Sequence, residues 1–75
     1  PDPEANVERG LVKAHQSRDC LLFNYDEDKL LAVAGLDGMV VVNTEDALLV
    51  VHKDDIKLVK ELVNEMQGTE LEKFS

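Results

Sequence analysis

Apolar and polar positions in the first two-thirds of the chain follow the short period that is typical of β-strands. Residues 11–15 alternate weakly, and stronger apolar runs follow at 20–25, 29–36, 39–42 and 47–52. Turn-forming residues separate these runs: Asp26-Glu27-Asp28, Asp37-Gly38, and Asn43-Thr44-Glu45-Asp46. Runs this short and this closely spaced, rich in β-branched residues, fit strands better than helices. The pattern therefore predicts a mainly β chain, in which the two corners at Asp37-Gly38 and residues 43–46 connect consecutive strands.

The last part of the chain has the longer period of an α-helix. Asp54 or Asp55 can cap the helix N-terminus, where the macrodipole favours negative charge. Gly68 is suited to end the helix. The apolar stripe follows i, i+3, i+4 spacing and consists of Ile56, Val59, Leu62, Val63 and Met66. The sequence predicts one amphipathic helix from about residue 54 to residue 67.

Several of the predicted strands are apolar on both faces. In the run 29–36, Leu30, Leu31, Ala32 and Val33 are apolar in succession, which is typical of a strand covered on both sides. Gly35 within this run indicates a bulge or a close approach of another backbone. A chain this short hides only about 60% of its unfolded surface, so it cannot cover both faces of every strand alone. We therefore expect part of the apolar surface to face a partner subunit or a neighbouring domain.

The domain organisation follows from the same pattern. Residues 1–10 are polar, contain both prolines and are predicted to form an extended lead-in. Residues 11–75 are predicted to form a single domain, because a chain of 75 residues supports one core at most. Since the chain begins at Pro1 without Met, we expect it to be a piece of a longer protein.

Charge and cysteine content exclude several classes of function. Acidic residues outnumber basic ones sixteen to eight, which gives a formal charge of −8. No cluster of Lys and Arg is present to neutralise phosphates, so neither nucleic acid nor an anionic membrane is expected as a partner. The longest apolar stretch, 30–42, contains Asp37 and is too short to span a bilayer. The lone Cys20 cannot form an internal disulfide and is predicted to be a buried structural thiol, which is consistent with a cytoplasmic protein.

No motif of catalysis or ligand binding is present. His15 and His52 are far apart, and neither has further metal ligands at the usual spacing. The acidic runs 26–28 and 54–55 do not match a calcium loop and are interpreted as a solvated turn and a helix cap. Gly35 and Gly38 lack the third glycine and the helix of a dinucleotide-binding turn, and neither serine has a base nearby in sequence. The sequence therefore predicts no catalytic, cofactor-binding or metal-binding residue in these 75 residues.

One stretch resembles the C-terminal region of mannose-1-phosphate guanylyltransferases, also called GDP-mannose pyrophosphorylases. That region of the family has a strand ending in Gly-Leu, a Val-Val-x-Thr segment, an Asp-Ala-Leu-Leu-Val strand, a Lys-Asp cap and a helix with a Val-Lys pair. The matching elements here are Gly35-Leu36, Val41-Val42-Asn43-Thr44, Asp46 to Val50, Lys53-Asp54 and Val59-Lys60. Asn6-Val7 and Asp19-Cys20-Leu21 match the family more loosely, so the resemblance runs from about residue 6 to residue 67.

The resemblance implies a fold and a setting. It implies an incomplete left-handed β-helix-like coil of short strands, capped by a helix, that follows a nucleotidyltransferase domain and contributes to dimerisation. The parent reaction would convert GTP and mannose 1-phosphate to GDP-mannose and pyrophosphate with magnesium. The Gly-rich catalytic loop of the family is absent from these residues, so no catalytic role carries over and no cofactor is expected within them.

Two hypotheses about function follow, beside a third in which the chain supplies a loop to a partner subunit's sugar-phosphate site. In the first, the chain is a structural and dimerisation domain whose partners are a second copy, the parent's catalytic domain, or both. In the second, it is a free-standing module that captures a protein or peptide along an exposed strand edge. The oligomeric state of the isolated chain in solution separates the two.

Overall fold

The computed structural model describes residues 5–75, which fold into six short strands followed by one α-helix and two 3₁₀-helices. The elements are β1 (Val7–Arg9), β2 (Val12–His15), β3 (Leu21–Asn24), β4 (Leu31–Ala34), β5 (Met39–Asn43), β6 (Leu48–His52), η1 (Lys53–Asp55), α1 (Leu58–Met66) and η2 (Glu70–Phe74). The predicted class, mainly β with a C-terminal amphipathic helix, is confirmed.

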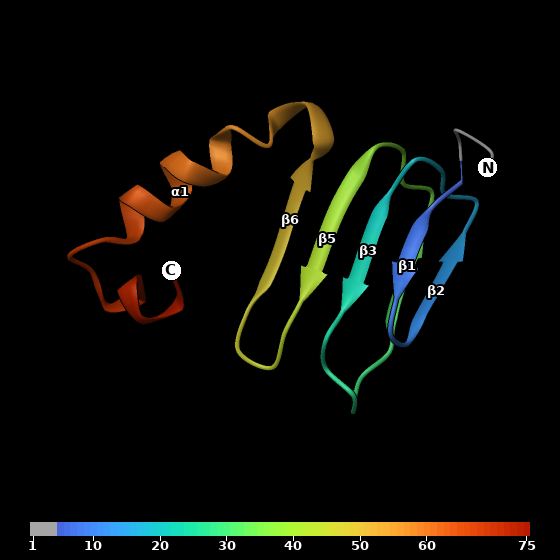
Figure 1. The fold of residues 1–75 in the computed structure, drawn as a ribbon, viewed down its shortest axis with the longest axis horizontal. Helices are drawn as coiled ribbons and strands as arrows, with labels where there is room; N and C mark the ends of the chain where they lie inside the picture. Colours follow the sequence, from blue (N-terminus) through green and yellow to red (C-terminus); the bar gives the residue numbers. More distant parts are fainter. Residues whose placement is uncertain (1–4) are drawn as a thin grey trace.

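The strands wind as an incomplete β-helix-like coil. Strands β1, β3 and β5 are parallel neighbours in one sheet, and β6 pairs with β5 in the antiparallel sense. Strands β2 and β4 form a second, parallel pair behind this sheet (Figure 1). A parallel bridge between Arg18 and Asp37 forms a third side, where the Arg18 N–H donates to the Leu36 carbonyl at 2.9 Å. The predicted β-helix-like coil is therefore confirmed, with two turns stacked and a third that ends in a hairpin.

The register shows how one turn stacks on the next. Asn24 and Asn43 occupy equivalent places in adjacent turns, 19 residues apart. Val7 pairs with Leu21 after only 14 residues, the same separation as between Asn6 and Cys20. The difference arises between β3 and β4, where residues 25–30 form a longer connection than the short corner between β1 and β2. This longer connection carries the acidic turn that the sequence indicated.

Left-handed backbone occurs at equivalent corners of the two turns. Gln16 (φ 48°) and Gly35 (φ 70°) both follow directly after paired strand ends, and Asp19 (φ 56°) and Gly38 (φ 68°) both follow the third-side bridge. The interpretation of Gly35 as a close backbone approach is wrong, because a Cβ at this position would meet no atom within 4 Å. The corner itself requires a positive φ, which glycine adopts without the steric cost of a side chain.

A small apolar core lies between the two sheets. Cys20, Leu22 and Val41 are buried, with exposed fractions of 1%, 0% and 4%. The inward residues of the second sheet that pack against them are Val12, Ala14, Leu31 and Val33. The predicted burial of Cys20 is confirmed, and its Sγ lies 3.2 Å from the Arg18 carbonyl oxygen.

The expectation of strands apolar on both faces holds for only part of the chain. In β3 and β5 the inward Leu22 and Val41 are buried, and the opposite face carries Leu21, Phe23, Val40 and Val42, of which Val40 is also buried. In β4 the outward residues are Ala32 and Ala34, which are exposed and small enough to need no cover. For the 29–36 run, the described chain covers one face only, and the cover of the other face by a partner stays a prediction.

The C-terminal helix is shorter than predicted. Residues 53–55 form the separate 3₁₀-turn η1, and α1 begins at Leu58. Asp54 and Asp55 do not cap α1; instead the His52 side chain accepts a hydrogen bond from the Asp54 backbone N–H and caps η1. The predicted stop is confirmed, because Gly68 has φ 77° directly after the cap residue Gln67.

The predicted lead-in contains a strand. Residues 1–4 of this segment lie outside the described residues, but Val7–Arg9 form β1 and pair with β3. All three β1 residues are exposed, so the strand is held by backbone hydrogen bonds at a sheet edge. A polar three-residue edge strand carries no apolar alternation, which is why the sequence pattern missed it.

Candidate functional site

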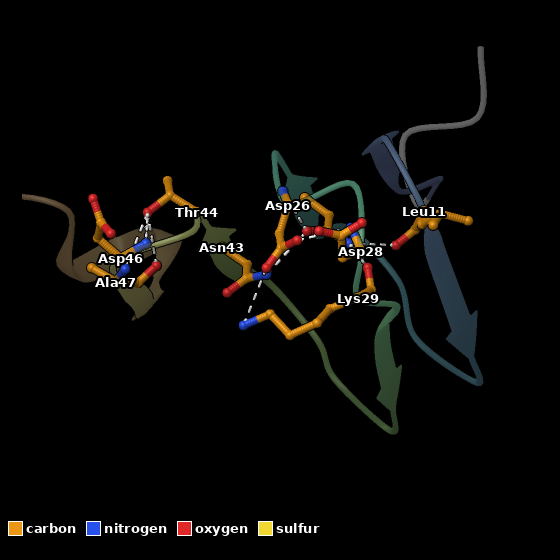
Figure 2. A network of polar contacts seen from close by, with 9 residues as sticks. Leu11, Asp26, Asp28, Lys29, Asn43, Thr44, Asp46 and Ala47 are labelled. Carbon is orange, nitrogen blue, oxygen red and sulfur yellow. Dashed lines mark hydrogen bonds and ion pairs between the residues drawn. The ribbon is translucent and has the colours of Figure 1, made fainter.

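A buried polar network fixes the turn at one end of the coil. The Asn24 side chain donates to the carbonyls of Leu11 (2.8 Å) and Lys29 (2.7 Å). Its Oδ1 accepts from the backbone N–H of Asp26 (3.1 Å) and from the Asn43 side chain (3.0 Å). The Asn24 side chain thus ties three turns of backbone together, and its partners Leu11, Lys29 and Asn43 are labelled in Figure 2. Because every buried side-chain polar atom in the described residues has a partner, this network is structural and offers no free group to a ligand.

Asp26 connects this network to the acidic connection. It is 8% exposed, and its carboxylate accepts from the Asp28 backbone N–H at 2.8 Å. That hydrogen bond is the largest influence holding the pKa of Asp26 below its ordinary value, and Lys29, with Nζ 3.3 Å from Oδ2, adds to it against the opposing effect of desolvation. Asp26 is therefore an ionised part of the turn, with its charge already matched by neighbours.

An acidic hollow lies beside this turn. It measures about 440 Å³ and is formed by the connection after β3 and the turn between β5 and β6. Its lining residues are Tyr25, Glu27, Asp28, Thr44, Glu45 and Asp46. None of the four carboxylates among them makes an ion pair within residues 5–75. The hollow therefore presents unmatched negative charge at one end of the molecule.

An apolar groove adjoins the same turn on the other side. It measures about 300 Å³ and lies between the β5–β6 hairpin and the helical C-terminal segment. The sheet contributes Val42, Thr44, Ala47, Leu48 and Leu49, and the C-terminal segment contributes Val59, Leu62, Val63, Met66, Phe74 and Ser75. No residue of α1 is buried, so the apolar stripe predicted from the sequence borders this groove and is only half covered.

The opposite face of β6 is also uncovered. Val50 pairs with Val41 and therefore shares the inward face of the sheet, yet Val50 is 54% exposed while Val41 is buried. The Leu48 side chain lies on the same face and is 59% exposed, although the residue also borders the groove. The cause is the topology, because among the described residues the second sheet ends at β4 and no strand lies opposite β6. The coil thus ends in an open apolar face.

The residues considered for chemistry do not come together. His15 is exposed at the end of β2, whereas His52 lies at the end of β6 with its Nδ1 near Asp54. Ser17 donates to the His15 carbonyl and accepts from the Leu36 N–H, which is a corner contact. Within residues 5–75 no group of three His, Cys, Asp or Glu side chains is placed to hold a metal ion.

The groove and the open face were not located from the sequence. The stripe of α1 and the two-faced strands indicated surplus apolar surface, but the sequence did not say where that surface would lie. The turn at residues 43–46 could have located this surface. It forms an antiparallel hairpin, which ends the coil and leaves β6 without a strand opposite its inward face. None of the helices among the described residues is long and apolar enough to span a bilayer.

Comparison with known families gives a match over most of the chain. The family model described as "MannoseP isomerase/GMP-like beta-helix domain" matches residues 14–66. A crystal structure from Thermus thermophilus, described as a mannose-1-phosphate geranyltransferase, is similar with a TM-score of 0.68 at 32% identity. That similarity covers 91% of this chain and 20% of the other chain.

Curated relatives are similar over almost the whole chain. The alginate biosynthesis protein AlgA of Pseudomonas syringae pv. tomato is 42% identical over 72 residues, which cover 92% of this chain and 14% of AlgA. Mannose-1-phosphate guanylyltransferase of Escherichia coli is 36% identical over 72 residues, covering 92% and 15%. The guanylyltransferase RfbM of Salmonella typhimurium is 33% identical over 73 residues, covering 97% and 15%. This chain thus spans about one-seventh of the length of these relatives.

Proposed function

Because this chain belongs to the MannoseP isomerase/GMP-like β-helix domain family, we propose that it is the C-terminal structural domain of a mannose-1-phosphate guanylyltransferase. The family match confirms the resemblance that residues 29–60 showed in the sequence. In this proposal the chain does no chemistry. Its role is to hold protein subunits together by burying apolar surface against a second copy.

The open face of β6 carries the proposal. Leu48 and Val50 lie on the inward face of the sheet, where the preceding strands have the second sheet for cover, and both are more than half exposed. Burying apolar surface contributes about 25 cal/mol per Å², so an uncovered inward strand face favours association. A second copy that lays the same face across β6 would complete the interrupted core, and a twofold arrangement places the same residues on both sides.

The proposed parent reaction lies outside this chain. In this proposal the metal-dependent transfer of a guanylyl group to mannose 1-phosphate belongs to the remaining part of a longer protein. Sequencing the coding region upstream of Pro1 tests this. A Gly-rich nucleotidyltransferase loop some hundreds of residues earlier supports the assignment, and an upstream region without one contradicts it.

The assembly role is tested by light scattering after size exclusion. The unaltered chain is expected to form a dimer at micromolar concentration. Val50→Glu places a charge on the open face and is expected to give a folded monomer, because Val50 is exposed in the single chain. The matched control is Val7→Glu, which changes a valine of similar exposure on β1, at the far edge of the same sheet, and should leave the dimer intact. A Val50→Glu chain with the same mass as the unaltered one would contradict the proposal.

A further inference from the structure

We propose that the apolar groove between β6 and α1 docks an extended polypeptide segment whose apolar side chains are followed by Lys or Arg residues. This docking surface differs from the open face proposed for assembly, because Val42 and Leu49 point to the opposite side of the sheet from Val41 and Val50, although Leu48 borders both surfaces. The inference therefore goes beyond the assembly role and does not depend on it.

The groove has the composition of a docking surface. Leu49 and Val42 form its floor on the sheet side, and Leu62, 45% exposed, stands on its helix side. Phe74, 43% exposed, closes the end formed by the C-terminal turn. The helix stripe and the sheet thus face one another across unfilled space of about 300 Å³. Apolar side chains entering this space would bury surface on both walls at once.

The free edge of β6 sets the conformation of the occupant. One edge of β6 is hydrogen-bonded to β5, and within the described chain the other edge has no strand partner. In Figure 1, α1 lies on the side of β6 away from β5, which is the side of the free edge. An extended segment laid between β6 and α1 could pair with this backbone while alternate side chains enter the groove.

The charge at one end of the groove sets the sequence of the occupant. Thr44 lines both the groove and the acidic hollow, so the two surfaces meet at the β5–β6 turn. Glu45 and Asp46 stand at this junction, and the hollow adds Glu27 and Asp28, all without an ion pair in the described chain. A cationic side chain arriving here gains the attraction of several carboxylates, which steers association and selects against acidic segments.

The same charge argues against a second copy as occupant. Each copy carries the same acidic turn beside its groove, so two grooves brought together would place unmatched carboxylates near one another. Juxtaposed like charges cost free energy unless cations separate them. A partner with apolar residues and a basic end meets no such opposition.

The test uses two labelled peptides and fluorescence anisotropy. One probe is acetyl-Leu-Val-Leu-Val-Lys-Lys-Lys, and the other replaces the three lysines with glutamates. The lysine probe is expected to bind the chain, with an affinity that falls as salt is raised, and the glutamate probe is expected to bind at least about tenfold more weakly. Equal binding of both probes, or no binding of the lysine probe at millimolar concentration, would overturn the proposal.

Substitutions then locate the site. Leu62→Gln on the groove wall and the double change Glu45→Gln/Asp46→Asn at the acidic junction are each expected to weaken the lysine probe about tenfold. The matched controls are Leu71→Gln and Glu8→Gln/Asp55→Asn, which change exposed leucine and acidic residues that do not line either hollow and should leave binding unchanged. The double change lies in an exposed turn, so it tests the site even if Leu62→Gln lowers stability.

The outcomes separate this proposal from the assembly role. Val50→Glu should abolish the dimer and leave probe binding intact. Leu62→Gln should weaken probe binding and leave the dimer intact. If Leu62→Gln abolishes the dimer instead, a second copy covers the groove and the peptide-docking proposal is wrong. If the lysine probe binds but the chain is monomeric at every concentration, the assembly role fails and the docking surface stands.

Discussion

At the scale of single residues, equivalent corners of the coil adopt the same left-handed backbone conformation with different residue types. Gln16 and Asp19 adopt positive φ in the first turn, where Gly35 and Gly38 do so in the second. Left-handed backbone costs a non-glycine residue roughly 1–2 kcal/mol. The first turn therefore stores local strain that its packing and hydrogen bonds must offset, and glycine relieves that strain in the second turn.

Gly10 and Gly35 form a matched pair for separating steric clash from backbone strain. Both have positive φ, but a Cβ at Gly10 would overlap the Asn24 carbonyl oxygen, whereas a Cβ at Gly35 meets nothing. Gly35→Ala should lower the free energy of unfolding by about 1–2 kcal/mol through strain alone. Gly10→Ala should lower it by clearly more, because the Asn24 backbone must also shift. Urea denaturation measures both, and equal losses would contradict the close approach.

Asp26 should make stability depend on acid pH. Its folded-state pKa lies below the ordinary value of 3.8 because of the Asp28 N–H and Lys29. The carboxylate therefore contributes stability that is fully present above pH 4 and is lost as the pH falls through the folded-state pKa. In Asp26→Asn the amide oxygen still accepts the Asp28 N–H but carries no charge. The urea midpoint of the unaltered chain should fall more steeply than that of Asp26→Asn as the pH is lowered below about 4.

The control for this titration is Glu27→Gln, which changes an exposed neighbouring carboxylate with no ion pair in the described chain. Its pH profile should follow that of the unaltered chain. Parallel profiles for all three proteins would show that Asp26 is not held ionised by its neighbours.

At the scale of elements, the sequence is informative wherever local chemistry decides the outcome. The strands β3, β5 and β6 and the stop at Gly68 were predictable from apolar runs and a glycine C-cap. Strand β1 was not, because only pairing with β3 makes a polar three-residue segment a strand. The groove was not predictable either, since it depends on where the hairpin places β6 relative to α1.

The start of the helical segment shows why residue type alone misled. The two aspartates suited a helix cap, but the chain leaves β6 through a 3₁₀-turn whose first N–H is bound by His52. The Nδ1 atom accepts the Asp54 N–H at 3.1 Å, and this places the imidazole against Gly38, where a Cβ would lie 3.2 Å from Nε2. The ring thus joins the end of β6, the corner before β5 and the turn η1.

His52→Ala and Asp54→Ala test this assignment of the cap. His52→Ala should lower the free energy of unfolding by about 1 kcal/mol, the usual cost of a lost side-chain cap. Asp54→Ala should change it by less than about 0.5 kcal/mol, because the Asp54 side chain is exposed and its backbone N–H remains capped. Thermal denaturation at neutral pH distinguishes the two. A larger loss of unfolding free energy in Asp54→Ala than in His52→Ala would show that the aspartate, not the histidine, is the cap.

At the scale of the whole molecule, the shape explains why uncovered apolar surface is present. The radius of gyration is 13.4 Å and the extents are 41 × 30 × 19 Å. A compact domain of this length would have a radius of about 11 Å. The excess arises because β6, α1 and η2 extend beyond the two-sheet coil on one side (Figure 1). Stability therefore rests on the small core between the sheets.

Adjacent leucines of β3 measure how much that core contributes. Leu22 is fully buried between the sheets, whereas Leu21 is 38% exposed on the outer face of the same strand. Leu22→Ala should cost about 2–5 kcal/mol, and Leu21→Ala about 1.5 kcal/mol or less, because part of its side chain is already in water. A domain of this length has roughly 4–11 kcal/mol of stability in total, so Leu22→Ala should remove a large share of it. Urea denaturation of dilute chain gives both values. Equal losses in the free energy of unfolding would show that the outer face is covered in solution as completely as the core. The single chain provides no such cover for Leu21.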